Sequence, residues 1–329
     1  MEVYFPSYYH SFRCIAGDCP DSCCKEWTVD VDADAAKFYR SLDGALGDRL
    51  RSVLEDTPDG TVMTIENGRC PMWRQDGLCR IQAELGHDAL CDTCRNFPRI
   101  RHDYGDFVEL GLELSCPEAA RLILGDTGGL LVQVQPGGET PEYDSEVMTI
   151  LRQSRKEALD FLRCAQNVGQ ALAGILLFAY GVQAAIDGAD TYASVKNCSA
   201  EAARFQGHSD AEALFALFRS LEVLTDEWMD LLQKPACAVL WDDALRNLAR
   251  YMFERYWLQA VSDFDLVCRV KLALAACLLV GALGGDRIQT AQLFSKEIEN
   301  DPDNVDTLLN AAYTSPALTD TNLLSLLLA

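Results

Sequence analysis

Basic residues are scarce in this sequence. Lysine and arginine together number 28 against 50 aspartates and glutamates, which gives a formal net charge of −22 over 329 residues. A groove for DNA or RNA, or a surface for anionic lipid, needs clustered positive charge to neutralise phosphates. We therefore expect no nucleic-acid partner and no membrane partner, whereas a basic protein partner is compatible with this charge.

Long apolar runs are also missing. A membrane-spanning helix needs about 20 predominantly apolar residues. Residues 164–186 are uncharged but interrupted by four Gln and Asn side chains, and the apolar run 272–283 has only 12 residues, so both are expected to be buried core helices. The opening residues, MEVYFPSYYHSF, lack the basic start and apolar core of a signal peptide. These features predict a cytoplasmic protein.

Several familiar catalytic motifs are absent from the sequence. It contains no Gly-rich turn after a strand, as dinucleotide-binding βαβ units have. It also contains neither the Gly-x-Ser-x-Gly elbow of serine hydrolases nor the His-Glu-x-x-His motif of zinc proteases. We therefore expect none of these three kinds of site.

Cysteine, in contrast, is abundant. Fourteen cysteines are present, and nine of them lie within the first 116 residues. In a reducing compartment such a group favours metal or redox chemistry over disulfides. The nine candidate metal ligands are Cys14, Cys19, Cys23, Cys24, Cys70, Cys79, Cys91, Cys94 and Cys116.

The cysteine spacings leave several kinds of site open. Cys70-x8-Cys79 and Cys91-x2-Cys94 could supply the four thiolates of a zinc site. The same four thiolates could hold an iron–sulfur cluster, and Cys91-x2-Cys94 alone could form a redox pair. The other five cysteines lie far apart, mostly in apolar helical patterns, and are expected to be core residues: Cys164, Cys198, Cys237, Cys268 and Cys277.

The chain divides into two parts by pattern. Residues 1–124 are rich in short motifs and turns and predict a small, irregular, cysteine-rich metal-binding domain. Residues 125–150 contain Gly-Gly and Pro-Gly-Gly and predict a linker, and residues 151–329 predict an all-α domain. The fold class is therefore mainly α. Expected elements are a strand at 27–32 and helices at 33–54, 209–232, 242–258, 264–283 and 288–300. Short terminal helices are expected to begin at Pro302 and Pro316.

An aromatic run opens the chain. It is expected either to pack over the metal site or to form a pocket wall for a cation or an adenine ring. The run comprises Tyr4, Phe5, Tyr8, Tyr9, His10 and Phe12.

The cysteine-bearing motifs resemble those of the flagellin lysine-N-methylases. The motifs are FRCIAGDC at 12–19 and DSCC at 21–24, CPM at 70–72 and DGLCRIQ at 76–82, LCDTCRNFPR at 90–99 and LSCPEAAR at 114–121. Parts are also similar to smaller chelating proteins rich in Cys-Cys motifs. A weaker similarity reaches FSKEIEN at 294–300, where Phe294 and Asn300 replace the Tyr and His usual in the family.

This resemblance implies a protein-lysine N-methyltransferase. The methyl donor would be S-adenosylmethionine, the cofactor a cysteine-bound 4Fe–4S cluster, and the partner flagellin or another lysine-bearing protein. Cys70, Cys79 and Cys94 recur in the smaller chelating proteins, and they are the favoured ligands together with one or more of Cys14, Cys19, Cys23 and Cys24. No catalytic or donor-binding residue is assigned. The alternative is a non-catalytic zinc- or iron-binding protein whose helical domain binds a partner.

Overall fold

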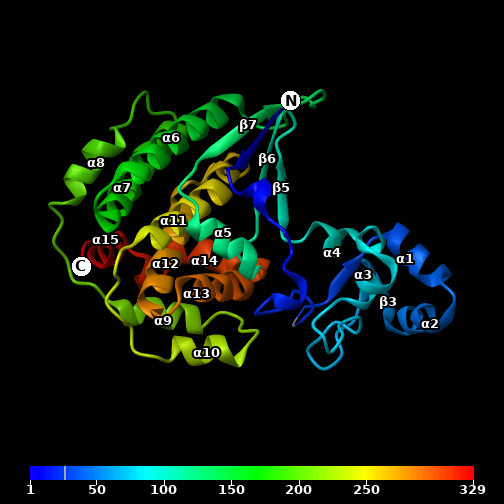
Figure 1. The fold of residues 1–329 in the computed structure, drawn as a ribbon. Helices are drawn as coiled ribbons and strands as arrows, with labels where there is room; N and C mark the ends of the chain where they lie inside the picture. Colours follow the sequence, from blue (N-terminus) through cyan, green and yellow to red (C-terminus); the bar gives the residue numbers. More distant parts are fainter. Residues whose placement is uncertain (26) are drawn as a thin grey trace.

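The protein is mainly α-helical. A computed structural model describes residues 1–25 and 27–329, and within them fifteen α-helices accompany two small sheets (Figure 1). The mainly α fold expected from the sequence is confirmed.

A four-stranded sheet joins the start of the chain to its middle. The strand order is β5–β6–β1–β7, with β1 parallel to β6 and antiparallel to β7, and β5 antiparallel to β6. Residues 125–150, expected as a linker, contain β7 and the start of α6. The strands are β1 (Glu2–Pro6), β5 (Arg99–Asp103), β6 (Phe107–Leu112) and β7 (Leu130–Val134).

The helices form one large core beside this sheet. Phe107, Tyr8 and Phe12 belong to the same hydrophobic cluster as the helices, so the chain start and residues 99–124 pack with the helical part. The helices are α5 (Pro117–Gly125), α6 (Ser145–Cys164), α7 (Val168–Ile186), α8 (Val195–Ala202), α9 (Ala211–Arg219), α10 (Asp226–Leu232), α11 (Asp243–Tyr256), α12 (Val267–Leu283), α13 (Arg287–Phe294), α14 (Pro302–Thr314) and α15 (Asp320–Leu328).

Two apolar helices occupy the centre of this core. Every residue of α12 is buried, which matches a helix that is apolar on all sides. Among the described residues, α7 is the one helix long and apolar enough to cross a membrane. It packs against α6, α8, α12 and α15, and 56% of its most apolar window is buried in the fold. This arrangement is that of a core helix.

Residues 29–96 form a second unit, whose smaller core lies around Tyr39, Leu50 and Met72. In Figure 1 this cysteine-rich unit stands to one side of the helical unit, in blue and cyan. A three-stranded sheet of order β2–β4–β3 is covered by short helices. Its elements are β2 (Val29–Val31), α1 (Ala33–Ser41), α2 (Gly44–Val53), β3 (Leu54–Thr57), β4 (Gly60–Met63), α3 (Arg80–Leu85) and α4 (Asp92–Asn96).

Two expected helices are each broken in two. The helix expected at 33–54 breaks at Leu42, which is extended, and Gly44, which has a φ of 79°. The helix expected at 209–232 breaks after Arg219. There the backbone N–H of Leu224 donates to Glu297, a residue distant in sequence. A tertiary hydrogen bond therefore overrides the apolar periodicity.

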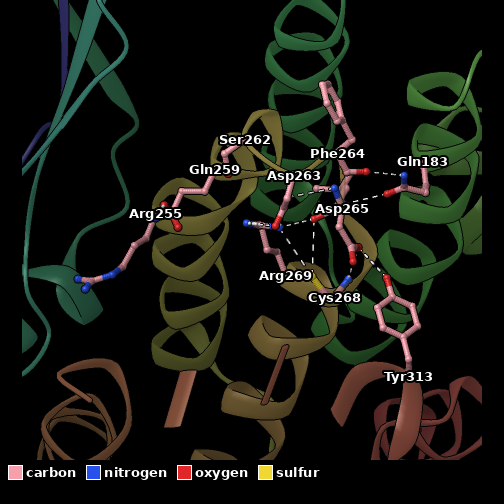
Figure 2. A network of polar contacts seen from close by, with 11 residues as sticks. Gln183, Arg255, Gln259, Ser262, Asp263, Phe264, Asp265, Cys268, Arg269 and Tyr313 are labelled. Carbon is pink, nitrogen blue, oxygen red and sulfur yellow. Dashed lines mark hydrogen bonds and ion pairs between the residues drawn. The ribbon is translucent and has the colours of Figure 1, made fainter. Parts of the chain in front are cut away.

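A polar network fixes the turn from α11 to α12 (Figure 2). The guanidinium of Arg269 pairs with both carboxylate oxygens of Asp263, and Tyr313 donates to Asp265. Gln183 of α7 donates to the carbonyl of Phe264, a non-glycine residue with a φ of 60°. The network holds this strained turn against α7 and satisfies the buried charge of Arg269.

Candidate functional site

A cavity of about 660 Å³ separates the cysteine-rich unit from the helical unit. Its walls come from the loop after β1, the starts of α3, α4 and α5, and the segment around the π-helix Ser295–Glu299. Seven of the nine candidate cysteines line it: Cys14, Cys19, Cys23, Cys24, Cys79, Cys94 and Cys116.

The remaining two candidates lie directly behind this lining. Cys70 is buried, shares a side-chain hydrogen bond with Cys24, and donates its backbone N–H to the Cys24 carbonyl over 2.7 Å. Cys91 is buried and shares a side-chain hydrogen bond with Cys94. The structure therefore brings all nine cysteines together around one cavity.

Paired thiols in this group share protons. The hydrogen bond with Cys94 lowers the pKa of Cys91 to about 7, and the hydrogen bond with Cys24 lowers that of Cys23 to about 7. The same hydrogen bonds raise the pKa of Cys94 and of Cys24. One sulfur of each pair thus has thiolate character near neutral pH, and the thiolate is the form that binds metals.

Burial favours the protonated thiol at Cys19, Cys79 and Cys116. Burial raises the pKa of Cys116 to about 12, and the nearby thiols of Cys19 and Cys23 add to this effect. Burial also raises the pKa of Cys79, next to Cys70 and Cys23. Binding of a cation would release these protons, so metal affinity and pH would be coupled.

Asp21 fastens the first cysteine loop to the helical unit. Its carboxylate accepts from Gln292 Nε2 over 3.0 Å and lies 3.3 Å from Lys296 Nζ and 2.7 Å from Lys25 Nζ. Burial raises the pKa of Asp21, but the hydrogen bond from Lys25 and the charge of Lys296 outweigh it, so the pKa is lowered overall. Gln292 also donates to the carbonyl of Ser115, beside Cys116.

Aromatic rings form an apolar wall of the cavity. Trp27 and Phe97 lie with their ring centroids 5.9 Å apart, and the indole N–H of Trp27 donates to the Cys23 carbonyl over 2.7 Å. Of the opening aromatic run, only Phe12 is in the cavity lining, and Arg99 stacks over its ring at 5.2 Å. Tyr8 packs in the helical core and Phe5 in the sheet.

The donor set has the chemistry of a metal or iron–sulfur site, although its described side chains do not converge. All fourteen cysteines, which lie within residues 1–25 and 27–329, are free thiols. As the side chains stand, no group of three or more His, Cys, Asp or Glu in the described chain is arranged to hold an ion. Sulfur donors at this density nevertheless match the ligands of zinc and of iron–sulfur clusters. Binding would require the side chains to turn toward a common centre.

The sequence did not predict which residues of the helical unit contact the first cysteine loop. Lys296 and Gln292 have no cysteine or turn motif near them, and only the weaker similarity at 294–300 pointed to this region. Of the five cysteines expected in the core, Cys198, Cys268 and Cys277 are buried. Cys164 and Cys237 are exposed, because Cys164 ends α6 and Cys237 lies in the loop after α10.

No family model and no solved structure matches this chain. Three curated proteins do. The flagellar biosynthetic protein FliU of Salmonella muenchen is 33% identical over 139 residues, which is 38% of this chain and 79% of that protein. Lysine-N-methylases of Salmonella typhimurium and Salmonella choleraesuis are 32% and 34% identical over 139 and 140 residues.

The match covers the relatives unequally. It spans most of FliU but only 33% of each lysine-N-methylase, and 38% of this chain. The cysteine motifs and these matches agree: the chain belongs to the flagellin lysine-N-methylase family.

Proposed function

We propose that this protein is an S-adenosylmethionine-dependent lysine N-methyltransferase that acts on flagellin and carries an iron–sulfur cluster at the cysteine-lined cavity. Membership of the family supports the reaction. The observation that carries the proposal is the gathering of nine cysteines, from six sequence motifs, around one cavity between two units of the fold.

The cluster would be held by Cys70, Cys79 and Cys94 with one cysteine of the first loop. When bound, it would supply iron to which the amino and carboxylate groups of the methyl donor can attach. The chain itself would orient the cluster, because Asp21 ties the first cysteine loop to α13 and to the π-helix.

The aromatic wall would give the substrate lysine an apolar environment. In the transfer, the lysine nitrogen attacks the donor methyl group, the carbon–sulfur bond breaks, and the ammonium formed loses a proton to solvent. Attack requires the neutral amine, and an apolar environment lowers the pKa of a lysine by disfavouring its charge. Phe12, Trp27 and Phe97 line the cavity and would exclude water from the lysine. The acidic chain would attract a lysine-bearing surface toward this site.

A second, non-catalytic function is favoured by the small part of each lysine-N-methylase that the sequence match covers. Only a third of each lysine-N-methylase is aligned with this chain. The cysteines could therefore bind zinc or iron without catalysis, while the helical unit binds a partner protein.

Labelled methyl donor distinguishes the two functions. The protein is purified without oxygen and incubated with flagellin from the same organism and S-adenosylmethionine labelled in its methyl group. We expect label on lysine, lost in Cys94→Ser and retained in the control Cys164→Ser, whose cysteine is exposed outside the cavity. Unlabelled lysines from a metal-loaded preparation, and no heat on titration with the donor, would support the non-catalytic function instead.

A further inference from the structure

A second cavity, also of about 660 Å³, lies between the four-stranded sheet and helices α6 and α11. It shares no lining residue with the cysteine-lined cavity. Its size is within the range of small-molecule sites, which is roughly 300–1,000 Å³. None of its lining residues takes part in the methyl transfer proposed above.

Positive charge gathers at this cavity although the chain is strongly acidic. Six of the 28 basic residues line it: Arg152, Arg155, Lys156 and Arg163 from α6, and Arg246 and Arg250 from α11. Four carboxyl groups face them in the walls, namely Glu109, Asp160, Asp243 and Glu254. The partners that neutralise Arg152 and Arg250, Glu2 and Asp126, are not among the lining residues. Each of the six basic groups has a carboxylate partner, so the cavity is rich in cationic donors rather than uncompensated, and an anion would bind by competing with these ion pairs.

Two of the guanidinium groups are held in place by main-chain oxygens. Arg246 Nη1 donates to the carbonyls of Leu162 and Ala165 over 2.8 and 2.6 Å. Arg250 Nη1 donates to the Gly128 carbonyl over 2.8 Å, and Nη2 donates to that of Ile123. Arg250 Nη1 also donates to Asp126 Oδ2 over 3.1 Å, and Arg246 Nε donates to Asp243 Oδ1 over 3.3 Å, so carbonyls and carboxylates together fix the orientation of both guanidinium groups. Among the described residues, the buried Nε of Arg250 has no hydrogen-bond partner.

The buried carboxyl groups oppose an anion only weakly. Glu109 is neutralised by a two-fold contact with Arg155. Glu254 lies 3.9 Å from Arg250 Nε, and burial raises its pKa to about 7 against the attraction of Arg250 and Arg155. Around neutral pH much of Glu254 is thus protonated, and a protonated carboxyl can donate to a bound oxygen.

We propose that this cavity binds a small phosphate-bearing molecule. A phosphate group offers three oxygens to donors from several sides, and arginine is the side chain whose geometry best matches it. Here donors approach from α6 on one side and from α11 on the other. Leu130, Leu159 and Leu162 give the cavity an apolar part that can cover the rest of the ligand.

The experiment uses the full chain with two probes, inorganic phosphate and adenosine monophosphate. Calorimetry and the thermal midpoint are measured at low and at high salt. We expect at least one probe to bind, with the affinity falling as salt rises. Phosphate alone would show that the phosphoryl group suffices, and binding of the nucleotide alone would show that the ligand needs more than phosphate. Binding of neither probe would overturn the proposal.

Variants identify the site. Arg250→Gln removes a guanidinium that is also part of the fold. The second variant is therefore Lys156→Gln with Arg163→Gln, both exposed at the cavity rim and both paired with Asp160. We expect each to weaken binding about tenfold or more. The matched control is Lys196→Gln with Arg204→Gln, exposed on and after α8. Equal affinity in the rim variant and in this control would contradict the assignment.

Discussion

Asp21 and Lys296 are 275 positions apart in the sequence and form an ion pair of 3.3 Å. Asp21 lies between Cys19 and Cys23, and Lys296 lies in the π-helix that borders the cavity. π-Helices occur frequently at functional sites. This contact joins the part of the chain that carries the cysteines to the part that carries the helical core.

Asp21→Asn should loosen this junction. The amide retains the shape but loses the charge that pairs with Lys296 and Lys25, so we expect a loss of about 1–3 kcal/mol in the free energy of unfolding. Chemical denaturation measures it. The control is Asp48→Asn, whose exposed pair with Arg51 should change stability by less than about 1 kcal/mol. Equal effects of the two substitutions would contradict the role given to Asp21.

Trp27→Ala should slow methyl transfer and shift its pH dependence. Without the indole ring, water reaches the substrate lysine, and its pKa rises toward the usual value of about 10.4. Each unit of that rise lowers the neutral fraction about tenfold near neutral pH. We expect the rate to fall accordingly and to recover at higher pH.

The pH profile of this variant separates a solvent effect from a general loss of structure. Phe38→Ala is the control, since Phe38 is exposed on α1 and does not line the cavity. A uniform loss of rate at all pH values in Trp27→Ala would argue against desolvation by the aromatic wall.

Glu254→Gln should stabilise the protein at alkaline pH. The pKa of Glu254 rises from 4.5 to about 7 on folding, mainly through burial. The folded state therefore holds a proton that the unfolded state has lost between these values, and stability falls as pH rises through this window. The neutral glutamine removes this cost, which is about 3 kcal/mol at most above pH 7 and absent below about pH 4.5.

The difference between wild type and variant is measured as the thermal midpoint at about pH 5 and pH 8. The control is Glu201→Gln, an exposed residue of α8. We expect the gain for Glu254→Gln to be larger at pH 8. A gain that does not change with pH would show that Glu254 is not held protonated by burial.

Local pattern predicted much of the helical part. Apolar spacing located α11, α12 and α13, and the short terminal helices begin at or soon after the proline at their predicted start. It failed at 220–225, where Leu224 donates to Glu297 instead of continuing a helix. Such a contact depends on a segment more than 70 residues away, which no local window contains.

The candidate site was predictable in its cysteines and not in its surroundings. Cysteine is rare enough in most proteins that clustered motifs stand out, whereas Asp21, Gln292 and Lys296 are ordinary surface residue types. The same holds for the second cavity. In the sequence, Arg152, Lys156 and Arg163 follow the helical spacing of a solvent-exposed face. Only the fold shows that α11 and the sheet lie opposite them, across the cavity.

The iron–sulfur cluster proposed at the cysteine-lined cavity is tested most directly by the metal content and visible spectrum of the protein purified without oxygen. We predict a brown protein with a charge-transfer band and about four irons per chain, as a 4Fe–4S cluster requires. A colourless protein with about one or two zinc ions per chain would contradict this, because the cysteines would then be structural ligands.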